Sequence, residues 1–224
     1  MCGRYAVFTL SPELIEEVLG FLPIDEHGLL VPRWNVAPTQ RAPVFRTTDG
    51  RRELAALRWG LVPSWADDLK IGARMINARA ETVAGKPSFR AAFKSRRCLV
   101  PASHFYEWTK TSTPKQPFLL RCADAPVFLM AGLWETWTDK ATGEVVETFT
   151  IVTTDANAVV RPVHDRMPVI LPRADWSAWL DPGNRDAAAL TKLLRPYEGP
   201  METRAITTSI NDARRNEPPV EVPQ

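Results

Sequence analysis

The sequence begins Met1-Cys2-Gly3-Arg4, so a cysteine directly follows the initiator methionine. Because the Cys2 side chain is small, we expect methionine aminopeptidase to remove Met1 and leave Cys2 as a 1,2-aminothiol. Its thiol (pKa about 8.5) and α-amine (pKa about 7.7 to 8) are then both partly deprotonated near neutral pH. Such an amine condenses with an aldehyde to a Schiff base, and the thiolate closes a five-membered thiazolidine. A lone cysteine indicates no function by itself, so other segments must support this chemistry.

Two further segments carry groups that can move protons. Phe105-Tyr106-Glu107-Trp108 places a carboxylate in an aromatic run, where it needs a partner or a raised pKa. His164 follows Pro162 and precedes an apolar run. A glutamate and a histidine together can transfer protons near neutral pH, although each alone is more often a structural hydrogen-bonding group.

The segment 75–82 combines amide, guanidinium and carboxylate side chains. If this segment is extended, Asn77, Arg79 and Glu81 share one face by the two-residue period of a strand. Such a face could hold a sugar and a phosphate, since arginine suits bidentate phosphate contacts. The alternative is a surface strand with ordinary charges.

Two aromatic segments allow a binding or a structural interpretation. Residues 34–40 should form a loop and not a central strand, because Pro38 lacks an N–H for a ladder. In 59–65, two tryptophans flank a turn. Either both pack in the core, or Trp65 offers a face for base stacking.

The sequence predicts no metal site and no cofactor. The histidines lie far apart without ligand spacing, at His27, His104 and His164. The cysteines are odd in number and lack CxxC spacing, which argues against a disulfide framework and a zinc site. Cys98 and Cys122 lie in apolar runs and are expected to be small core residues with free thiols.

Composition indicates one globular domain over residues 1–224, with 45% apolar and 24% charged residues. No stretch approaches a membrane span, and no secretory signal precedes the first motifs, so we expect a cytoplasmic protein. The net charge of +2 neither demands nor excludes a polyanionic partner.

Periodicity and turn residues predict an α+β fold with a dominant, curved antiparallel sheet. A first helix is predicted from Ser11 as N-cap to Gly20. The predicted strands are 42–46, 53–59, 97–100, 105–109, 118–122, 127–133 and 147–153. Further helices are predicted at 155–160, 174–180 and 186–194. The proline-containing tail, residues 215–224, is expected to be loose.

Six motifs occur together in register over roughly residues 2–210 and closely resemble the SOS-response-associated peptidase (SRAP) family, or abasic-site processing proteins. They are Met1-Cys2-Gly3-Arg4, Asn35-Val36-Ala37-Pro38, Trp59-Gly60-Leu61-Val62-Pro63, Ile76-Asn77-Ala78-Arg79-Ala80-Glu81-Thr82, Arg97-Cys98-Leu99-Val100-Pro101 with Phe105-Tyr106-Glu107-Trp108, and His164-Asp165-Arg166-Met167-Pro168. The resemblance implies one domain with a bifurcated, mostly antiparallel sheet forming a pseudo-barrel with short peripheral helices. It also implies a covalent crosslink to abasic sites in single-stranded DNA.

Carried over by motif, Cys2 is the crosslinking nucleophile, and Asn77 positions both Cys2 and the opened sugar. Glu107 assists proton transfer, and His164 acts at the sugar hydroxyl in Schiff-base chemistry, strand scission or reversal. The implied DNA-binding residues are Arg4, Pro38, Trp65, Arg79, Lys86, Thr153 and Arg166. We also expect Arg4 and Arg79 to depress the pKa of the Cys2 thiol. His104 departs from the glycine frequent in the family, outside this catalytic set.

The expected partner is single-stranded DNA containing abasic sites, bound by a monomer that associates with the nucleoid on damaged DNA. AP-lyase and self-processing activities fit the same residues. Two alternatives remain at this level. One is a thiol peptidase using Cys2, His164 and Glu107. The other is a non-catalytic single-stranded DNA-binding module that uses Trp65 and the arginines.

Overall fold

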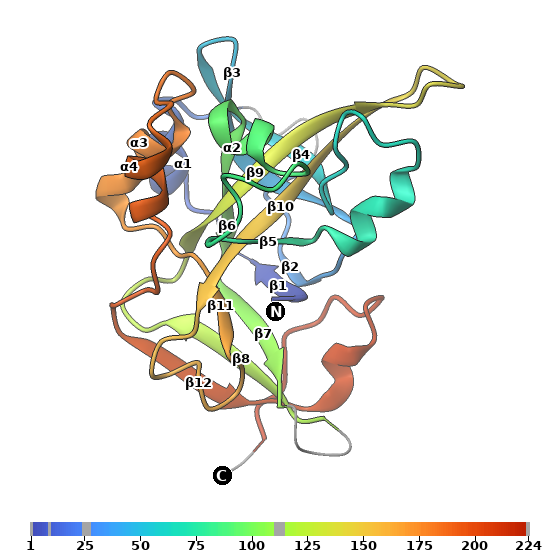
Figure 1. Cartoon of the computed structure of the whole chain (residues 1–224). Helices are drawn as coiled ribbons and strands as arrows, with labels where there is room; N and C mark the ends of the chain where they lie inside the picture. Colours follow the sequence, from blue (N-terminus) through green and yellow to red (C-terminus); the bar gives the residue numbers. More distant parts are fainter. Residues whose placement is uncertain (1, 9, 24–27, 110–114, 223–224) are drawn as a thin grey trace.

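The computed structural model describes residues 2–8, 10–23, 28–109 and 115–222, in which a closed five-stranded barrel adjoins an open five-stranded sheet (Figure 1). The barrel is closed because β9 and β10 pair with each other as well as with β6 and β4. Its strands are β3 (Arg41–Thr48), β4 (Arg51–Trp59), β6 (Arg97–Ala102), β9 (Phe128–Thr138) and β10 (Val145–Asp155). The predicted α+β class and pseudo-barrel are confirmed.

Strand β10 is the point at which the sheet bifurcates. Its first part pairs parallel with β4 at Thr148 and Phe149, and its second part pairs parallel with β5 (Asn77–Arg79). Its end also pairs antiparallel with β11 (Arg166–Pro168). One strand therefore carries both the barrel and the short strands on which Asn77 and Arg166 lie.

The open sheet has the order β12-β8-β7-β1-β2. Its strands are β1 (Arg4–Val7), β2 (Arg33–Val36), β7 (His104–Trp108), β8 (Pro117–Cys122) and β12 (Met201–Ala205). Ser103 alone separates barrel strand β6 from β7, and its backbone N–H donates to the Ala6 carbonyl at 2.7 Å. The two sheets are thus joined through one residue.

Short helices surround the sheets (Figure 1). Helix α1 (Pro12–Leu19) begins at the predicted N-cap, where Ser11 accepts from the Leu14 N–H, and ends at Gly20 with φ of 85°. The others are α2 (Arg90–Ser95), α3 (Trp176–Leu180), α4 (Ala187–Lys192), η1 (Leu69–Arg74), η2 (Arg173–Asp175) and η3 (Thr208–Asn211). Helices α3 and α4 confirm the predictions for 174–180 and 186–194. None of the helices in the described part of the chain has the length and apolar character that crossing a bilayer requires.

The helix predicted at 155–160 is wrong. Asp155 is the last residue of β10, and Asn157 begins a turn in which its side-chain oxygen accepts from the N–H groups of Val159 and Val160. An asparagine side chain that bonds its own backbone in this way competes with helix formation.

The loop predicted at 34–40 is also partly wrong. Residues 34–36 belong to edge strand β2, which pairs with β1, and the turn begins only after Val36. Pro38 lies beyond the last paired residue, so its missing N–H does not interrupt the ladder.

The tail predicted to be loose is held to the open sheet over residues 216–222. The Asn216 side chain accepts from the Trp34 N–H at 2.7 Å, and the Val222 N–H donates to the Ala205 carbonyl at 2.9 Å. The last two residues, 223–224, lie outside the described residues. Edge strands β2 and β12 supply the backbone partners that the sequence pattern does not reveal.

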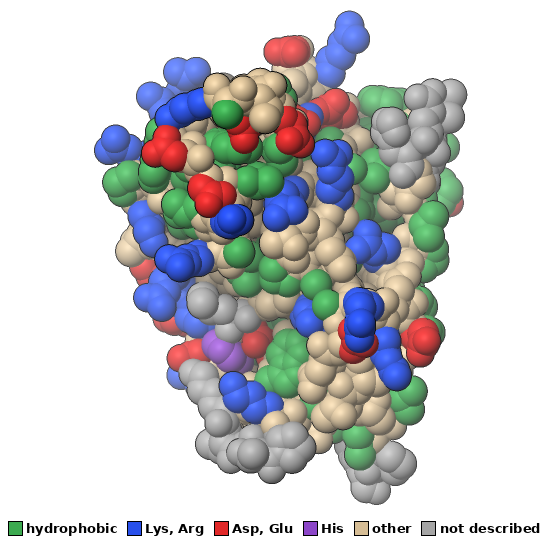
Figure 2. All heavy atoms as spheres, turned by 90° about the vertical axis from the view of Figure 1, so that its right-hand side faces the viewer, with side chains coloured by type: hydrophobic (Ala, Val, Ile, Leu, Met, Phe, Trp, Pro, Cys, Tyr) green, Lys and Arg blue, Asp and Glu red, His purple; other side chains and the backbone are tan. Residues whose placement is uncertain are grey.

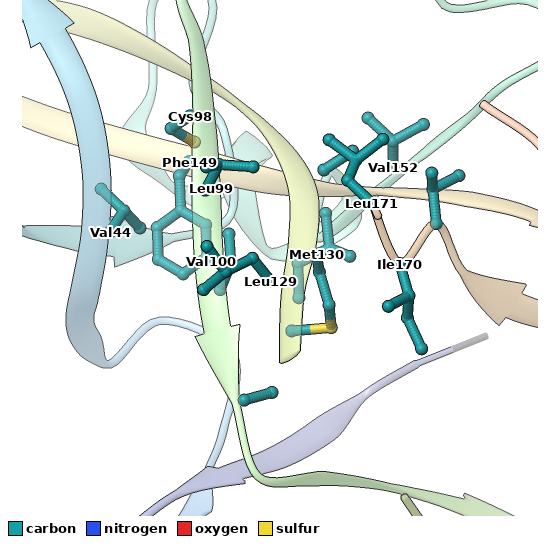
Figure 3. Close-up of a cluster of buried hydrophobic side chains, with 14 of the residues drawn as sticks. Val44, Cys98, Leu99, Val100, Leu129, Met130, Phe149, Val152, Ile170 and Leu171 are labelled. Atoms are coloured by element: carbon teal, nitrogen blue, oxygen red, sulfur yellow. The ribbon is translucent and has the colours of Figure 1, made fainter. Parts of the chain in front are cut away.

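The main core fills the barrel (Figure 3). Its labelled side chains come from β3, β6, β9, β10 and the segment after β11, and they are Val44, Cys98, Leu99, Val100, Leu129, Met130, Phe149, Val152, Ile170 and Leu171. Cys98 and Cys122 are buried free thiols, as expected. Trp59 is fully buried and belongs to the core. Trp65 is 57% exposed, so it is a surface residue and not part of the core.

The backbones of Gly60 and Gly72 pack directly against each other. A Cβ at Gly60 would lie 2.5 Å from the Gly72 carbonyl oxygen, and the φ of Gly60 is +121°. The Leu61 N–H then donates to the Met75 carbonyl at 3.2 Å, and the Trp59 indole donates to the Ile76 carbonyl at 2.9 Å. This close approach holds the segment that leads into β5.

We predict that Gly60→Ala lowers the free energy of unfolding by about 3 kcal/mol, because it adds both backbone strain and overpacking. Chemical denaturation measures the effect. Gly85→Ala is the control, since a Cβ there has no atom within 4 Å, and we expect a change within about 0.5 kcal/mol. Equal unfolding midpoints for the two variants would contradict the packing role of Gly60.

Candidate active site

Cys2 lies where the barrel meets the open sheet, immediately before β1. Strand β1 pairs with β7 so that Arg4 is opposite Tyr106, and the next step of this register brings Gly3 alongside Glu107. The Cys2 residue is fully buried, and its thiol donates to the Arg4 carbonyl at 3.7 Å. Met1, whose removal was expected, lies outside the described residues.

Asn77 ties Cys2 to the barrel. Its Nδ2 donates to the Cys2 carbonyl at 2.8 Å, and its position is fixed by the pairing of β5 with β10, in which Asn77 is opposite Ile151. Within the described residues, nothing donates to the buried Oδ1 of Asn77. A buried acceptor without a donor is costly, so it is suited to a group that arrives with a substrate.

Glu107 and His164 line one cleft of about 540 Å³. Its lining residues are Gly3, Arg4, Glu107, Trp108, Lys115, His164 and Asn211, and we call it the Glu107 cleft. Glu107 is only 3% exposed because it follows Phe105 by two residues and continues the inward face of β7. The predicted acid-base pair is therefore brought together beside the start of the chain.

The His164 ring is oriented through its Nδ1. This atom accepts from the Arg166 N–H at 3.0 Å, and the Asp165 Oδ1 lies 2.9 Å from it. The amide requires a lone pair on Nδ1, whereas the carboxylate favours a proton there, so the two contacts respond oppositely to protonation of the ring. Both contacts fix the Nδ1 side of the His164 ring to the following residues, Asp165 and Arg166.

A second cleft, of about 730 Å³, has Asn77 in its lining. Its lining residues are Arg74, Asn77, Arg79, Glu81, Thr82, Gly85, Lys86 and Phe89, and we call it the Arg79 cleft. The extended backbone ends at Arg79, so Glu81 stands in the following turn and does not continue the face predicted for the strand. Arg79 and Lys86 are exposed. Figure 2 shows lysine and arginine side chains scattered over the side of the molecule that is on the right in Figure 1.

Arg4 is less available to a phosphate than the sequence suggests. Its Nη1 donates to the Asn35 side chain at 2.8 Å and to the Ile210 carbonyl at 2.9 Å, and Nη2 donates to the Asn211 carbonyl at 3.2 Å. These bonds clamp the η3 segment onto β1. The guanidinium still borders the Glu107 cleft.

Arg166 is likewise engaged. It donates to the Glu81 carboxylate at 2.7 Å, to the Asp155 carboxylate at 2.8 Å and to the Thr153 carbonyl at 2.7 Å. Two carboxylates thus compensate the charge of this arginine, and a phosphate would have to compete with them.

The remaining predicted binding residues lie outside both clefts. Trp65 is 57% exposed and presents its ring to solvent, while Pro38 is half-buried. Thr153 is fully buried in β10, so its side chain does not form a groove surface. His104 is also buried, and its Nε2 lies 2.6 Å from the Tyr106 hydroxyl in a structural network. His27 lies outside the described residues.

The expected depression of the Cys2 thiol pKa is wrong for the chain with Met1 attached. Burial raises the pKa of the Cys2 thiol, and the Glu107 carboxylate raises it further. The guanidinium of Arg4 is directed toward Asn35 and the η3 segment, and Arg79 faces the other cleft. Of the charges that act on the thiol, the Glu107 carboxylate has the largest effect, and it disfavours the thiolate.

The model of the SOS response associated peptidase (SRAP) family matches residues 1–213. The chain belongs to the SRAP family. The abasic site processing protein YoqW of Bacillus subtilis (strain 168) is 40% identical over 222 residues, covering 97% of each chain. The abasic site processing protein HMCES of Xenopus tropicalis is 30% identical over 97% of this chain and 77% of its own length. A crystal structure of a protein from Bacteroides thetaiotaomicron is 30% identical, with a TM-score of 0.83, and covers 94% of this chain and 97% of that chain.

The SRAP motifs include Trp108 but not Lys115, Asn211 or Arg74, which also line the clefts. Lys115, Trp108 and Asn211 border the Glu107 cleft, and the Trp108 indole donates to the Asn211 side chain at 2.8 Å. Asn211 is 104 residues from Glu107 in sequence, and no local pattern links them. Arg74, in the last turn of η1, also lines the Arg79 cleft. No motif or periodicity in the sequence indicates it as a binding residue.

We predict that Glu107→Gln lowers the pKa of the Cys2 thiol, because it removes a negative charge that disfavours the thiolate. At a fixed pH below the thiol pKa, Cys2 should then react faster with iodoacetamide, as followed by peptide mass spectrometry. Cys98 is the internal control, since burial raises its pKa and the charge acting on it is Arg46. An unchanged rate at Cys2, or an equal rise at Cys98, would contradict the proposed influence of Glu107.

Proposed function

We propose that this SRAP protein processes abasic sites in single-stranded DNA by forming a covalent thiazolidine between Cys2 and the opened abasic sugar. The names of its abasic site processing relatives support this assignment. The observation that carries it is the position of Cys2, held by Asn77 between a cleft with Glu107 and His164 and a cleft with exposed basic residues. The activity requires that Met1 has been removed.

Glu107 is assigned to the opening of the sugar. An abasic deoxyribose exists mainly as a closed hemiacetal, which has no free aldehyde. Opening breaks the ring C–O bond, removes the proton of the anomeric hydroxyl and delivers a proton to the ring oxygen. A buried carboxyl group beside Cys2 is suited to accept the first proton and return one to the ring oxygen.

Cys2 then supplies both nucleophiles. Its free amine adds to the aldehyde carbon, and loss of water gives an imine. The thiolate attacks the imine carbon, the nitrogen takes up a proton, and the thiazolidine closes. Loss of Met1 places a positive α-ammonium on Cys2 itself, which lowers the thiol pKa and opposes the effects of burial and Glu107.

Asn77 and His164 are assigned to positioning and to later steps. The Oδ1 of Asn77 is suited to accept from the Cys2 amine or a sugar hydroxyl, while its Nδ2 holds the Cys2 carbonyl. His164 would act at the sugar hydroxyl, either in strand scission as an AP lyase or in reversal of the crosslink. Arg79 and Lys86 would hold phosphates that flank the lesion, with Arg4 bordering the other side.

Turnover of other peptides by Cys2 has less support. The Asn77 amide polarises the Cys2 carbonyl, whereas the bond that releases Met1 requires polarisation of the Met1 carbonyl. Removal of Met1 is therefore assigned to an aminopeptidase. A peptide-turnover assay without DNA separates the two activities, since a true peptidase would retain turnover.

We predict that the Met1-processed wild type forms a heat-stable adduct with a single-stranded oligonucleotide containing one abasic site, as seen on a denaturing gel. Processed Cys2→Ser keeps the amine but lacks the thiol, so it should give an adduct only after borohydride reduction of its imine. Processed Cys2→Ala should behave in the same way, and an undamaged strand should give no adduct. A heat-stable, unreduced adduct of Cys2→Ser would rule out the thiazolidine.

We also predict that binding to single-stranded DNA weakens with salt, and that Arg79→Gln makes the slope of log affinity against log salt shallower by about 0.7. This change corresponds to one lost phosphate contact. Arg51→Gln is the matched control, because Arg51 is exposed on β4 outside both clefts. A slope that Arg79→Gln leaves unchanged would remove Arg79 from the phosphate contacts.

A further inference from the structure

A third cleft, of about 440 Å³, lies between α2 and α4, and three cations line it. Its lining residues are Ala84, Arg90, Ala91, Phe93, Lys94, Arg185, Ala187 and Leu190, and we call it the Arg90 cleft. Among the described residues, no carboxylate lines it, and the side chains of Arg90, Lys94 and Arg185 make no hydrogen bond or ion pair. The adjacent Asp186 is occupied as the N-cap of α4, where it accepts from the Ala188 and Ala189 N–H groups.

The Arg90 cleft adjoins the Arg79 cleft through one stretch of chain. The Lys86 N–H donates to the Thr82 carbonyl and the Arg90 N–H donates to the Lys86 carbonyl, both at 2.9 Å. Arg90 and Lys94 are one turn apart in α2, and the bond from Arg90 to Lys86 continues this four-residue spacing, so at a helical rise the three residues lie on one side over about 12 Å. Lys86 lines the Arg79 cleft and Arg90 lines the Arg90 cleft, so these cations link the two clefts along the segment that leads from β5 to α2 (Figure 1).

The Arg90 cleft combines exposed cations with an apolar lining. Phe93 and Leu190 are its buried apolar residues, and Ala84, Ala91 and Ala187 are its exposed ones. A free inorganic anion gains nothing from contact with an apolar lining. A nucleotide, by contrast, presents an apolar base face or sugar together with an anionic phosphate. The chemistry of the cleft therefore matches a strand of nucleotides better than an isolated phosphate.

We propose that the Arg90 cleft is an additional binding subsite for the phosphodiester backbone of the same DNA strand, beyond the phosphates held by Arg79 and Lys86. This inference rests on the proposed function for the identity of the ligand. The subsite extends the DNA footprint away from Cys2 and takes no part in the covalent chemistry. It contributes affinity that does not depend on the lesion, and only to strands long enough to reach it.

The test measures affinity by fluorescence anisotropy with undamaged single strands, using Cys2→Ala protein so that crosslinking plays no role. One strand is short, and others are lengthened at the 5′ or the 3′ side. Lengthening on one side should increase the affinity of the parent protein. Arg90→Gln/Lys94→Gln should abolish this increase and make the salt slope for the long strand shallower by about 1.4, at about 0.7 per contact. Glutamine preserves helix propensity in α2.

Arg41→Gln/Arg51→Gln is the matched control, because it removes the same charge from β3 and β4, outside the Arg79 and Arg90 clefts. Arg185→Gln, on a different segment, should reduce the slope by about 0.7 without altering α2. A length dependence and salt slope that stay at the parent values in both Arg90-cleft variants would overturn the proposal. An equal reduction in the control pair would also overturn it, since the effect would then be one of net charge.

The proposed function is tested separately. Crosslinking of a short abasic strand by processed protein with Cys2 intact should proceed at the parent rate in Arg90→Gln/Lys94→Gln. If the parent protein forms no crosslink but the length dependence follows the Arg90 cleft, the function of Cys2 fails while the subsite stands. If crosslinking of the short strand slows together with binding of the long one, the cleft is not a separate subsite and the inference fails.

Discussion

The pairing of β10 along both of its edges is the constraint on which the site depends. The strand closes the barrel through β4 and β9, and its second part then carries β5 and β11. Because β5 and β11 both pair with β10, this one strand sets the positions of Asn77 and of the segment that follows His164. The Gly60–Gly72 contact supports this arrangement, since a Cβ on either residue would clash with the backbone of the other in the segment that leads into β5.

The electrostatics of Cys2 differ from those of an activated thiol. Burial and Glu107 both favour the neutral thiol, so the chain with Met1 attached holds a nucleophile of low reactivity. This is consistent with a chemistry in which the amine reacts first and the thiol needs to act only on an imine already formed next to it. Proximity then substitutes for a low thiol pKa, because the attack is intramolecular.

The sequence predicted the longer strands, the first helix and the last two helices, because runs such as 147–153 and caps such as Ser11 and Gly20 carry strong local signals. Strands β5 and β11 have three residues each, and their pairing with β10 is a tertiary event without a local pattern. The site residues Cys2, Asn77, Glu107 and His164 were predicted from motifs. In the structure Asn77 bonds to Cys2, Glu107 acts on the Cys2 thiol, and Glu107 and His164 line one cleft. The direction of the Cys2 pKa and the ion pairs of Arg166 could not be predicted, since both depend on which groups the fold buries side by side.

Ser103 is the single residue between β6 and β7, and its N–H is bonded to Ala6 of β1. The barrel and the open sheet are therefore joined without a flexible linker. A hinge needs a few residues whose backbone angles can change, and a paired residue between two paired strands offers none. The joint therefore holds the two sheets in a nearly fixed relation, and under the proposed function any adaptation would fall to the DNA strand. Under that proposal, a flexible single strand could bend its backbone to present one sugar to Cys2 more readily than a stiff double helix could, so a rigid joint between the sheets would itself favour the single-stranded form.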